Sequence, residues 1–296
     1  MTCLYDAVIL GGGPAGASCA LWLKMLGHSP LLIEKDSKLG GLQNYSPYPN
    51  GWIATSHHQT GEQIAQTVHD NILSNQIECA LNSTAYEIER RDSHSFQVKI
   101  NTTHPLLQEV QTRFVVLACG VQPVQANFEP SDKVFIGPGK QIADHRFKDE
   151  KVAILGGGDN AFENFHFIKS QQPAEIHIYA RTIKARREFT QITTSEHISI
   201  GEYSIDQDPN DCTRQKIRPY NSLYGWAPAL SFLKNLPIKL TNRGFIQTDF
   251  NTLETSEPGI YAIGEITQRL HPCVVTSMAD GVTAAKAISN KLEKHA

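Results

Sequence analysis

DAVILGGGPAG at residues 6–16 and KVAILGGGDNA at residues 151–161 decide the fold of this 296-residue chain. Each stretch is a short apolar run that ends in three glycines, which predicts a strand, a tight turn and then a helix. Such a turn presents backbone N–H groups at the positive end of the helix, where a pyrophosphate binds. One motif is a weak signal, but two copies, each followed by another strand, predict two dinucleotide-binding units.

The glycines of the first motif have separate physical tasks. Gly11 permits the tight turn, and Gly13 lets the backbone approach a pyrophosphate closely. Gly16 brings the helix against the strand. The equivalent positions of the second motif are Gly156, Gly158 and Ala161.

The residue that ends the next strand differs between the two copies. PLLIE at 30–34 ends in Glu34, which is placed to accept hydrogen bonds from a ribose diol, as in FAD or NAD. EIHIYA at 175–180 ends in Ala180, and a basic cluster follows. Guanidinium groups match phosphate geometry, so the cluster favours NADP(H), although a solvated surface turn has the same composition. The cluster consists of Arg181, Lys184, Arg186 and Arg187.

The composition narrows the class of protein. Hydrophobic residues make up 40% and charged residues 19% of the chain, and the net charge is −3, which predicts a globular protein without a nucleic-acid or membrane partner. No apolar stretch is long enough for a membrane span, and no signal peptide is expected. The six cysteines are scattered with no C-x-x-C, which is typical of a cytoplasmic protein with free thiols and no metal centre.

The order of the expected elements places the second unit inside the first. Thr60 and Gln63 form a capping box for a helix over 61–74, and alternating segments at 84–91 and 95–102 predict a meander. The late segment GIYAIGE at 259–265 completes the first sheet. The remaining expectations are a buried strand at 113–120, loops at 121–150, a strand at 223–228 and a helix at 274–294. The predicted fold class is α/β, with two Rossmann-like three-layer domains, the second inserted in the first.

These motifs together resemble the thioredoxin-reductase-like branch of the FAD- and NAD(P)-dependent pyridine nucleotide-disulfide oxidoreductases. The resemblance covers nearly the whole chain, through both glycine motifs, the strand VVLACG at 115–120 and the late GIYAIGE. It implies that residues 1–118 and 239–296 bind FAD and that residues 119–238 bind NADPH. It also implies a homodimer whose two domains rotate to present NADPH and acceptor alternately to the flavin.

The resemblance extends to single residues. Gly264-Glu265 falls where the family has a Gly-Asp that contacts the ribityl chain, and Cys273 lies in a segment whose backbone faces the flavin. Arg181 and Arg186 fall on two of three basic positions of the family's H-R-R-x-x-x-R phosphate motif. The predicted FAD contacts are Gly11, Gly13, Pro14, Ala15, Gly16, Glu34, Lys35, Gly41, Gln43, Gly120, Gly264, Glu265, Cys273 and Val274. The predicted NADPH contacts are Gly156, Gly158, Asp159, Asn160, Ala161, Arg181, Arg186 and Arg187.

One departure from the family decides the expected function. The family has a C-x-x-C just before the second motif, where this chain has Gly139-Lys-Gln-Ile142. Thioredoxin reduction through that dithiol is therefore excluded, and the chain resembles the dithiol-free ferredoxin or flavodoxin–NADP reductases of thioredoxin-reductase type. We expect hydride transfer from NADPH to FAD and then electron transfer to an acceptor such as ferredoxin or flavodoxin.

Two alternatives stay open. Cys273 at a helix N-terminus could act as a catalytic thiol on a disulfide substrate, although a small space-filling residue is the simpler interpretation. The altered run Ala180-Arg181-Thr182 also fits a degenerate NADPH site, in which case the flavoprotein takes electrons from a protein donor.

Overall fold

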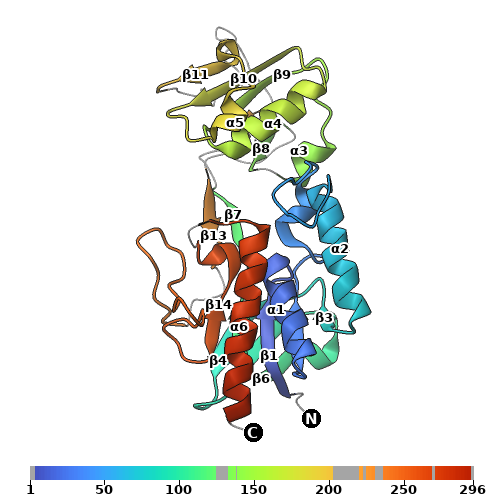
Figure 1. Cartoon of the computed structure of the whole chain (residues 1–296), viewed down its shortest axis with the longest axis vertical. Coiled ribbons are helices and arrows are strands. Elements are labelled where there is room, and N and C mark those ends of the chain that lie inside the picture. Colours follow the sequence, from blue (N-terminus) through green and yellow to red (C-terminus); the bar gives the residue numbers. More distant parts are fainter. Residues whose placement is uncertain are drawn as a thin grey trace. The chain divides into compact units, whose positions relative to one another are not determined.

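The chain divides into two compact units. Unit 1 comprises residues 1–122 and 227–296, and unit 2 comprises residues 123–226. Two short strands, β7 (Val121–Pro123) and β13 (Trp226–Pro228), pair with each other where the chain passes between the units. The computed structural model, drawn in Figure 1, describes residues 4–124, 133–137, 139–202, 220–222, 225–230, 236–268 and 271–294.

Unit 1 is built on a seven-stranded sheet in which parallel strands carry an antiparallel meander. The first strand, β1 (Leu4–Leu10), pairs in parallel with β2 (Pro30–Ile33) on one side and β6 (Glu109–Leu117) on the other. Next, β3 (Glu78–Ala80) pairs with β2, and β14 (Ile260–Ala262) pairs with the end of β6. The strand order therefore reverses between β1 and β6, which is where α/β sheets bind ligands.

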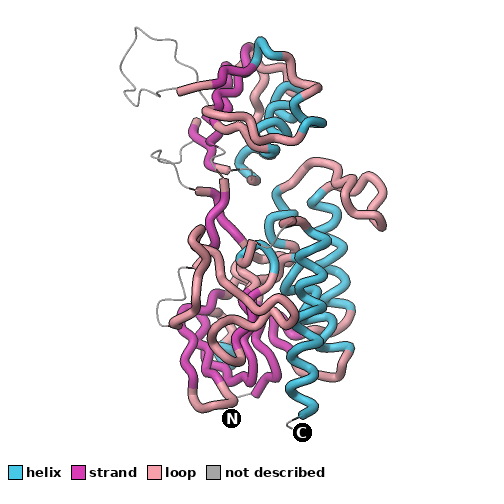
Figure 2. The backbone as a smooth tube through the Cα atoms, turned by 60° about the vertical axis from the view of Figure 1, so that its left-hand side comes forward, coloured by secondary structure: helices cyan, strands magenta, loops and turns pink. Residues whose placement is uncertain are grey.

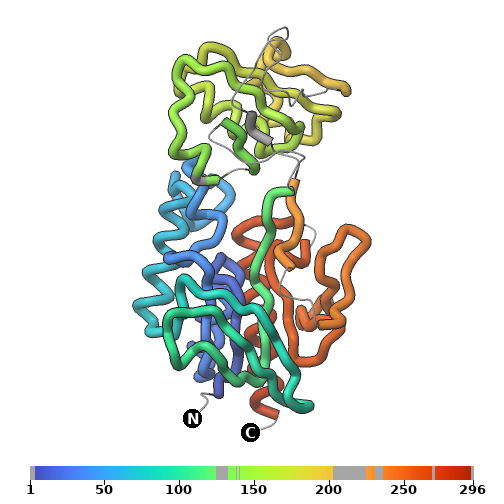
Figure 3. The backbone as a smooth tube through the Cα atoms, turned by 180° about the vertical axis from the view of Figure 1, so that it is seen from behind, coloured from blue at the N-terminus to red at the C-terminus, as the bar shows by residue number. Residues whose placement is uncertain are grey.

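The meander of β4 (Thr84–Arg90) and β5 (Phe96–Asn101) joins the beginning of β6 in antiparallel register. Figure 3 shows it in teal, from behind. Along β1, Val8 and Leu10 pack in the core that includes meander residues, whereas Ile9 packs in the core that includes the helices. Unit 1 thus has three layers, with the parallel strands in the middle.

Three helices cover the other face of this sheet, as Figure 2 shows in cyan. They are α1 (Pro14–Met25), α2 (Gly61–Ser74) and α6 (Val274–Lys294). The bounds of α2 and its capping box are as predicted. The Thr60 N–H donates to Gln63 Oε1 at 2.9 Å, and the Gln63 N–H donates to Thr60 Oγ1 at 3.3 Å.

Small residues let α6 approach α1 closely. A Cβ added to Gly281 would strike the carbonyl oxygen of Ala15, and the Ser18 hydroxyl donates to the carbonyl oxygen of Met278 at 2.8 Å. The start of α1, which carries the first glycine motif, is therefore fixed against the last helix of the chain.

Unit 2 is a parallel five-stranded sheet in the order β11-β10-β9-β12-β8. Phe162 and Phe165 of α4 (Asp159–Ser170) are fully buried in one core with Ile154 and Ile178 of the sheet. The strands are β8 (Val134–Ile136), β9 (Lys151–Leu155), β10 (Glu175–Ala180), β11 (Ile198–Ile200) and β12 (Tyr220–Ser222). The shorter elements are α3 (Lys140–Asp144), α5 (Arg187–Thr190), η1 (Gly41–Tyr45), η2 (Pro105–Leu107), η3 (Ser195–His197) and η4 (Gly264–Ile266).

The expectation that residues 121–150 form loops is wrong, because β7, β8 and α3 lie there. Three-residue strands leave no periodic signal, and β8 is a strand because it pairs with the sequence-distant β12. Of the strand expected at 223–228, residues 226–228 form β13, whereas 223–224 lie outside the described residues, as does Cys212. In the described part of the chain, no helix is long and apolar enough to cross a membrane.

Candidate functional site

The first glycine turn lies between the ends of β1 and β6. The Gly11 N–H donates to the Ile33 carbonyl oxygen at 2.8 Å, and its φ of +109° favours glycine. A Cβ at Gly11 would strike the Ala118 carbonyl oxygen, and one at Gly16 would strike the Gly11 carbonyl oxygen. Both positions therefore need glycine because backbone occupies the space of a side chain.

The beginning of α1 has the uncapped backbone that an anion seat requires. Its N-cap residue is Gly13, and within the described residues no side chain caps the helix, so its first N–H groups are available. Gly41 faces Gly13 so closely that a Cβ on Gly41 would lie 3.0 Å from the Gly13 Cα. This lining is backbone, and a pyrophosphate would meet the N–H groups of Ala15 and Gly16, because Pro14 has no N–H.

Glu34 follows β2 and joins the turn directly. Its Oε2 accepts the Gly12 N–H at 2.6 Å, and its Oε1 accepts the Asp36 N–H at 2.9 Å. Burial raises the pKa of this carboxyl group, and the two backbone hydrogen bonds oppose that shift. A carboxylate has about four acceptor positions, so two remain for a ribose diol. Gly12 was not among the predicted contacts, although three consecutive glycines already marked the turn.

The predicted ribityl segment lies against the start of α1. Gly264 has a φ of +73°, and a Cβ there would lie 2.9 Å from the Ala15 Cβ. Its N–H donates to Oδ2 of the buried Asp280 at 3.1 Å. Glu265 is half-buried, and burial raises the pKa of its carboxyl group. Asp280 was missed by sequence reasoning; an Asp-Gly within a long helix was the available signal.

The other predicted FAD contacts differ in exposure. Lys35 is exposed, Gln43 is half-buried on η1, and Gly120 follows β6 with a φ of +64°. Val274 is buried at the first position of α6. The structure thus brings the glycine turn together with Glu34, Gly41 and Gly264.

The thiols of unit 1 have different surroundings. Cys273 is exposed just before α6; its N–H donates to Thr276 Oγ1 at 3.1 Å, and its sulfur lies 3.4 Å from that oxygen. Cys119 donates to the Leu10 carbonyl oxygen at 3.3 Å, and burial raises the pKa of its thiol to about 12. In the described part of the chain the cysteines are free. Cys273 is exposed, Cys79 and Cys119 are half-buried, and Cys19 is buried.

The second glycine turn repeats the first in unit 2. The Gly156 N–H donates to the Tyr179 carbonyl oxygen at 2.9 Å, as Gly11 does to Ile33. Gly158 is the N-cap residue of α4, again without a side-chain cap among the described residues. The shared pattern makes Ala180 the counterpart of Glu34, and the Ala180 side chain supplies no acceptor.

A basic loop takes the place of the acid in unit 2. Gly157 holds it, because its carbonyl oxygen accepts the N–H groups of Lys184 at 2.7 Å and Ala185 at 2.9 Å. Arg186 Nε donates to Asp159 Oδ2 at 2.8 Å, and the Arg186 N–H donates to Oδ1 at 2.8 Å. Asn160 accepts from the Asn164 side chain through its carbonyl oxygen at 2.7 Å.

Comparison with known proteins identifies the family of this chain. The family described as pyridine nucleotide-disulphide oxidoreductase matches residues 5–197. The chain belongs to the pyridine nucleotide-disulphide oxidoreductases. It is 26% identical to a ferredoxin–NADP reductase of Limosilactobacillus fermentum, over 97% of this chain and 94% of that protein. It is also 26% identical to a thioredoxin reductase of Ureaplasma parvum, over 95% of each chain.

A solved structure supports the fold. The thioredoxin reductase of Lactococcus lactis superposes with a TM-score of 0.79 at 21% identity, over 98% of this chain and 99% of that one. The predicted α/β fold class with two Rossmann-like domains is confirmed. Membership of the pyridine nucleotide-disulphide oxidoreductases also confirms the prediction of an oxidoreductase that uses FAD and NADPH. The homodimer, the cytoplasmic location and the individual cofactor contacts stay predictions.

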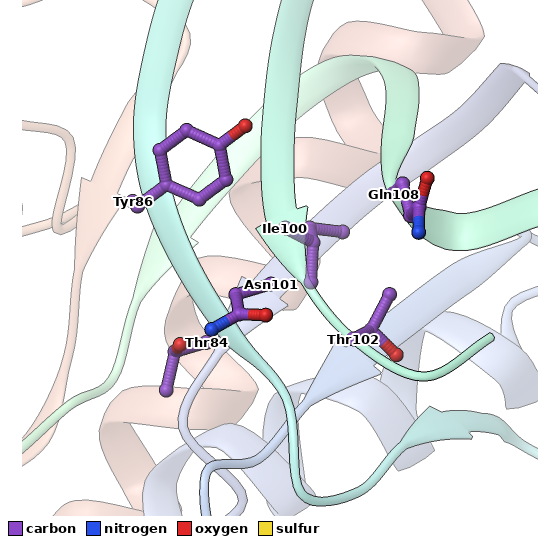
Figure 4. Close-up of a pocket in the computed structure, with 6 residues that line it drawn as sticks. All are labelled: Thr84, Tyr86, Ile100, Asn101, Thr102 and Gln108. Atoms are coloured by element: carbon purple, nitrogen blue, oxygen red, sulfur yellow. The ribbon is translucent and has the colours of Figure 1, made fainter. Parts of the chain in front are cut away.

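This oxidoreductase also has a hollow of about 430 Å³ on the meander, shown in Figure 4. Its lining comes from β4, from the end of β5 and from Gln108 before β6. The lining residues are Thr84, Tyr86, Ile100, Asn101, Thr102 and Gln108. None of them is a predicted nucleotide contact, so the candidate site rests on the two glycine turns.

Proposed function

We propose that unit 1 holds FAD, that unit 2 holds NADPH, and that the enzyme passes electrons to a one-electron carrier protein such as ferredoxin or flavodoxin. The observation that carries the acceptor class is the sequence Gly139-Lys-Gln-Ile142, which contains no dithiol in a family named for disulphide chemistry. When bound, FAD supplies the chemistry that accepts a hydride and releases electrons singly.

The residues of unit 1 fit FAD by their donor and acceptor types. The N–H groups at the start of α1 suit a pyrophosphate, and the remaining acceptor positions of Glu34 suit the adenosine ribose. Glu265 offers a carboxylate that lacks a hydrogen-bond partner among the described residues, and it stands where the ribityl hydroxyls are expected. A carboxyl group largely removed from water needs a hydrogen-bond partner, and a ribityl hydroxyl would supply one.

The residues of unit 2 fit NADPH better than NADH. Ala180 cannot accept a hydrogen bond from a free ribose 2′-hydroxyl, and the adjacent loop is basic. Hydride transfer between two rings depends mainly on their positioning, so the lack of an acid–base dyad in the described site does not argue against an enzyme.

The first test is anaerobic titration of the FAD-loaded protein with NADPH and, separately, with NADH. We expect NADPH to bleach the flavin absorbance at far lower concentration than NADH. The reduced enzyme is then mixed with ferredoxin or flavodoxin, and carrier reduction is followed by its own absorbance change. A flavoprotein that neither nucleotide bleaches would contradict the NADPH assignment and favour a protein electron donor.

A second candidate is disulfide reduction through Cys273, and the exposure of this thiol just before α6 is the observation that favours it. The Cys273→Ser variant separates the two functions, with Cys119→Ser as a matched control at a half-buried thiol. Loss of turnover with a disulfide substrate but not with the carrier would support the thiol. Unchanged turnover with both acceptors would remove it.

A further inference from the structure

We propose that Arg186 does not read the 2′-phosphate of NADPH but neutralises Asp159 beneath the nucleotide's pyrophosphate, and that Arg181, Lys184 and Arg187 supply the charge that selects the 2′-phosphate. This inference rests on the proposed function of unit 2. It changes the role of one predicted contact and adds Lys184 to the site.

The side chain of Arg186 is already engaged. Its Nε donates to Asp159 Oδ2 at 2.8 Å, and one of its terminal nitrogens lies 3.5 Å from Glu188 Oε1. The guanidinium also lies over the Phe189 ring, 5.1 Å from the centroid. A phosphate would have to compete for this group with a carboxylate that the group already contacts at hydrogen-bond distance. The guanidinium is thus held as a structural partner.

The carboxylate that it contacts stands at the pyrophosphate seat. Asp159 is the first residue of α4, directly after the N-cap Gly158, and the first turn of this helix is the expected seat. An unpaired carboxylate there would repel the pyrophosphate. The Arg186 charge removes that repulsion without touching the ribose, so its effect is the same for NADPH and NADH.

The remaining cations of the loop stand free. Arg181, Lys184 and Arg187 are exposed, and in the described part of the chain none of them makes an ion pair. The loop that carries them is fixed on the turn, because the Lys184 N–H donates to the Gly157 carbonyl oxygen. Arg181 directly follows Ala180, the counterpart of the ribose-binding Glu34. Free cations on a fixed backbone at this point suit a phosphate on the ribose.

The experiment uses the FAD-loaded enzyme and measures two dissociation constants. One is that of 2′,5′-ADP, which carries the 2′-phosphate but no pyrophosphate, and the other is that of ADP-ribose, which carries the pyrophosphate but no 2′-phosphate. The variants are Arg186→Gln, Asp159→Asn, the double variant, Arg181→Gln and Lys184→Gln. Arg146→Gln is the control, an exposed arginine of unit 2 outside the loop. Arg186→Lys, which keeps the charge, guards against a folding defect in Arg186→Gln.

We expect Arg186→Gln to weaken the binding of ADP-ribose about tenfold, because a charge-assisted contact near the pyrophosphate is lost. Arg186→Lys should weaken this binding less. Adding Asp159→Asn to Arg186→Gln should restore most of that affinity. Arg181→Gln or Lys184→Gln should raise the dissociation constant of 2′,5′-ADP about tenfold. The dissociation constant of ADP-ribose should stay within about twofold of its value in the unmodified enzyme.

Two results would overturn the inference. If Arg186→Gln lost affinity for 2′,5′-ADP while its affinity for ADP-ribose stayed unchanged, Arg186 would be the ligand of the 2′-phosphate. If the double variant did not recover affinity for ADP-ribose, Arg186 would not act by neutralising Asp159. Failure of the proposed function looks different, because the unmodified enzyme would then bind neither fragment.

Discussion

The two glycine turns have the same backbone hydrogen-bond pattern, but the middle glycine has different partners in each. These partners close the turn. In unit 1 the middle glycine, Gly12, donates its N–H to the carboxylate of Glu34. In unit 2 the corresponding Gly157 packs against Ala180 and Thr182 and accepts two N–H groups from the basic loop. The first turn is closed by an acid from the neighbouring strand, and the second is closed by backbone from a cationic loop.

This difference teaches how one motif serves two nucleotides. We propose that the backbone provides the pyrophosphate seat in both units, since each helix begins without a side-chain cap in the described residues. The residue after the strand then sets the local charge, negative at Glu34 and positive beyond Ala180. On this proposal, the selectivity for a nucleotide is a property of the closing residues.

The largest expected effect comes from adding one methyl group to the first turn. In Gly16→Ala the new Cβ would strike the Gly11 carbonyl oxygen, so we expect loss of bound FAD and about 3 kcal/mol of destabilisation. The matched change in unit 2 is Ala161→Gly, which should cost about 1 kcal/mol and leave FAD bound. FAD content and denaturant unfolding measure both. Full FAD occupancy in Gly16→Ala would show that the turns tolerate the same bulk.

A smaller effect follows from removing the acid that closes the first turn. Glu34→Ala leaves the N–H groups of Gly12 and Asp36 without their acceptor, which should cost about 2–3 kcal/mol and raise the FAD dissociation constant about 100-fold. Glu34→Gln keeps one acceptor oxygen and should lose less. Flavin fluorescence on dilution gives the constant. Equal affinities for Glu34→Ala and the unmodified protein would refute a role for Glu34 in closing the turn.

Asp280 tests the contact that holds Gly264 beside the first turn. Asp280→Ala removes the acceptor of the Gly264 N–H, so we expect about tenfold weaker FAD binding, equivalent to about 1.4 kcal/mol. Asp280→Asn retains an acceptor oxygen and should recover most of the affinity. If both variants bind FAD equally weakly, the charge of Asp280 matters and not its hydrogen bond.

The smallest effect is a change in pH dependence. Burial holds the pKa of Glu265 above its ordinary value of 4.5, so the folded protein binds this proton more tightly than the unfolded chain. The tighter proton binding adds to the free energy of unfolding. This contribution is fully present below the pKa of the unfolded chain and is lost as pH rises through the pKa of the folded protein. In the apoprotein, Glu265→Gln should therefore have the flatter dependence of Tm on pH. Parallel curves for the two proteins would contradict the burial of this carboxyl group.

Much of this organisation was predictable because it is local. The capping box of Thr60 and Gln63, the bounds of α2 and α6 and both glycine turns follow from short-range patterns. By contrast, β7 and β8 were missed because three-residue strands form only where a sequence-distant partner is available. Asp280 was missed because its role depends on a contact with Gly264 from another element.

By itself, the sequence determined that two nucleotide turns exist, that only the first is followed by an acid and that no C-x-x-C is present. These features depend on residue identity and on spacing within single motifs. Only the tertiary structure decided which groups close each turn. Glu34 is engaged by Gly12, Gly264 by Asp280 and Arg186 by Asp159, because packing brings together residues whose separation along the chain carries no signal of contact.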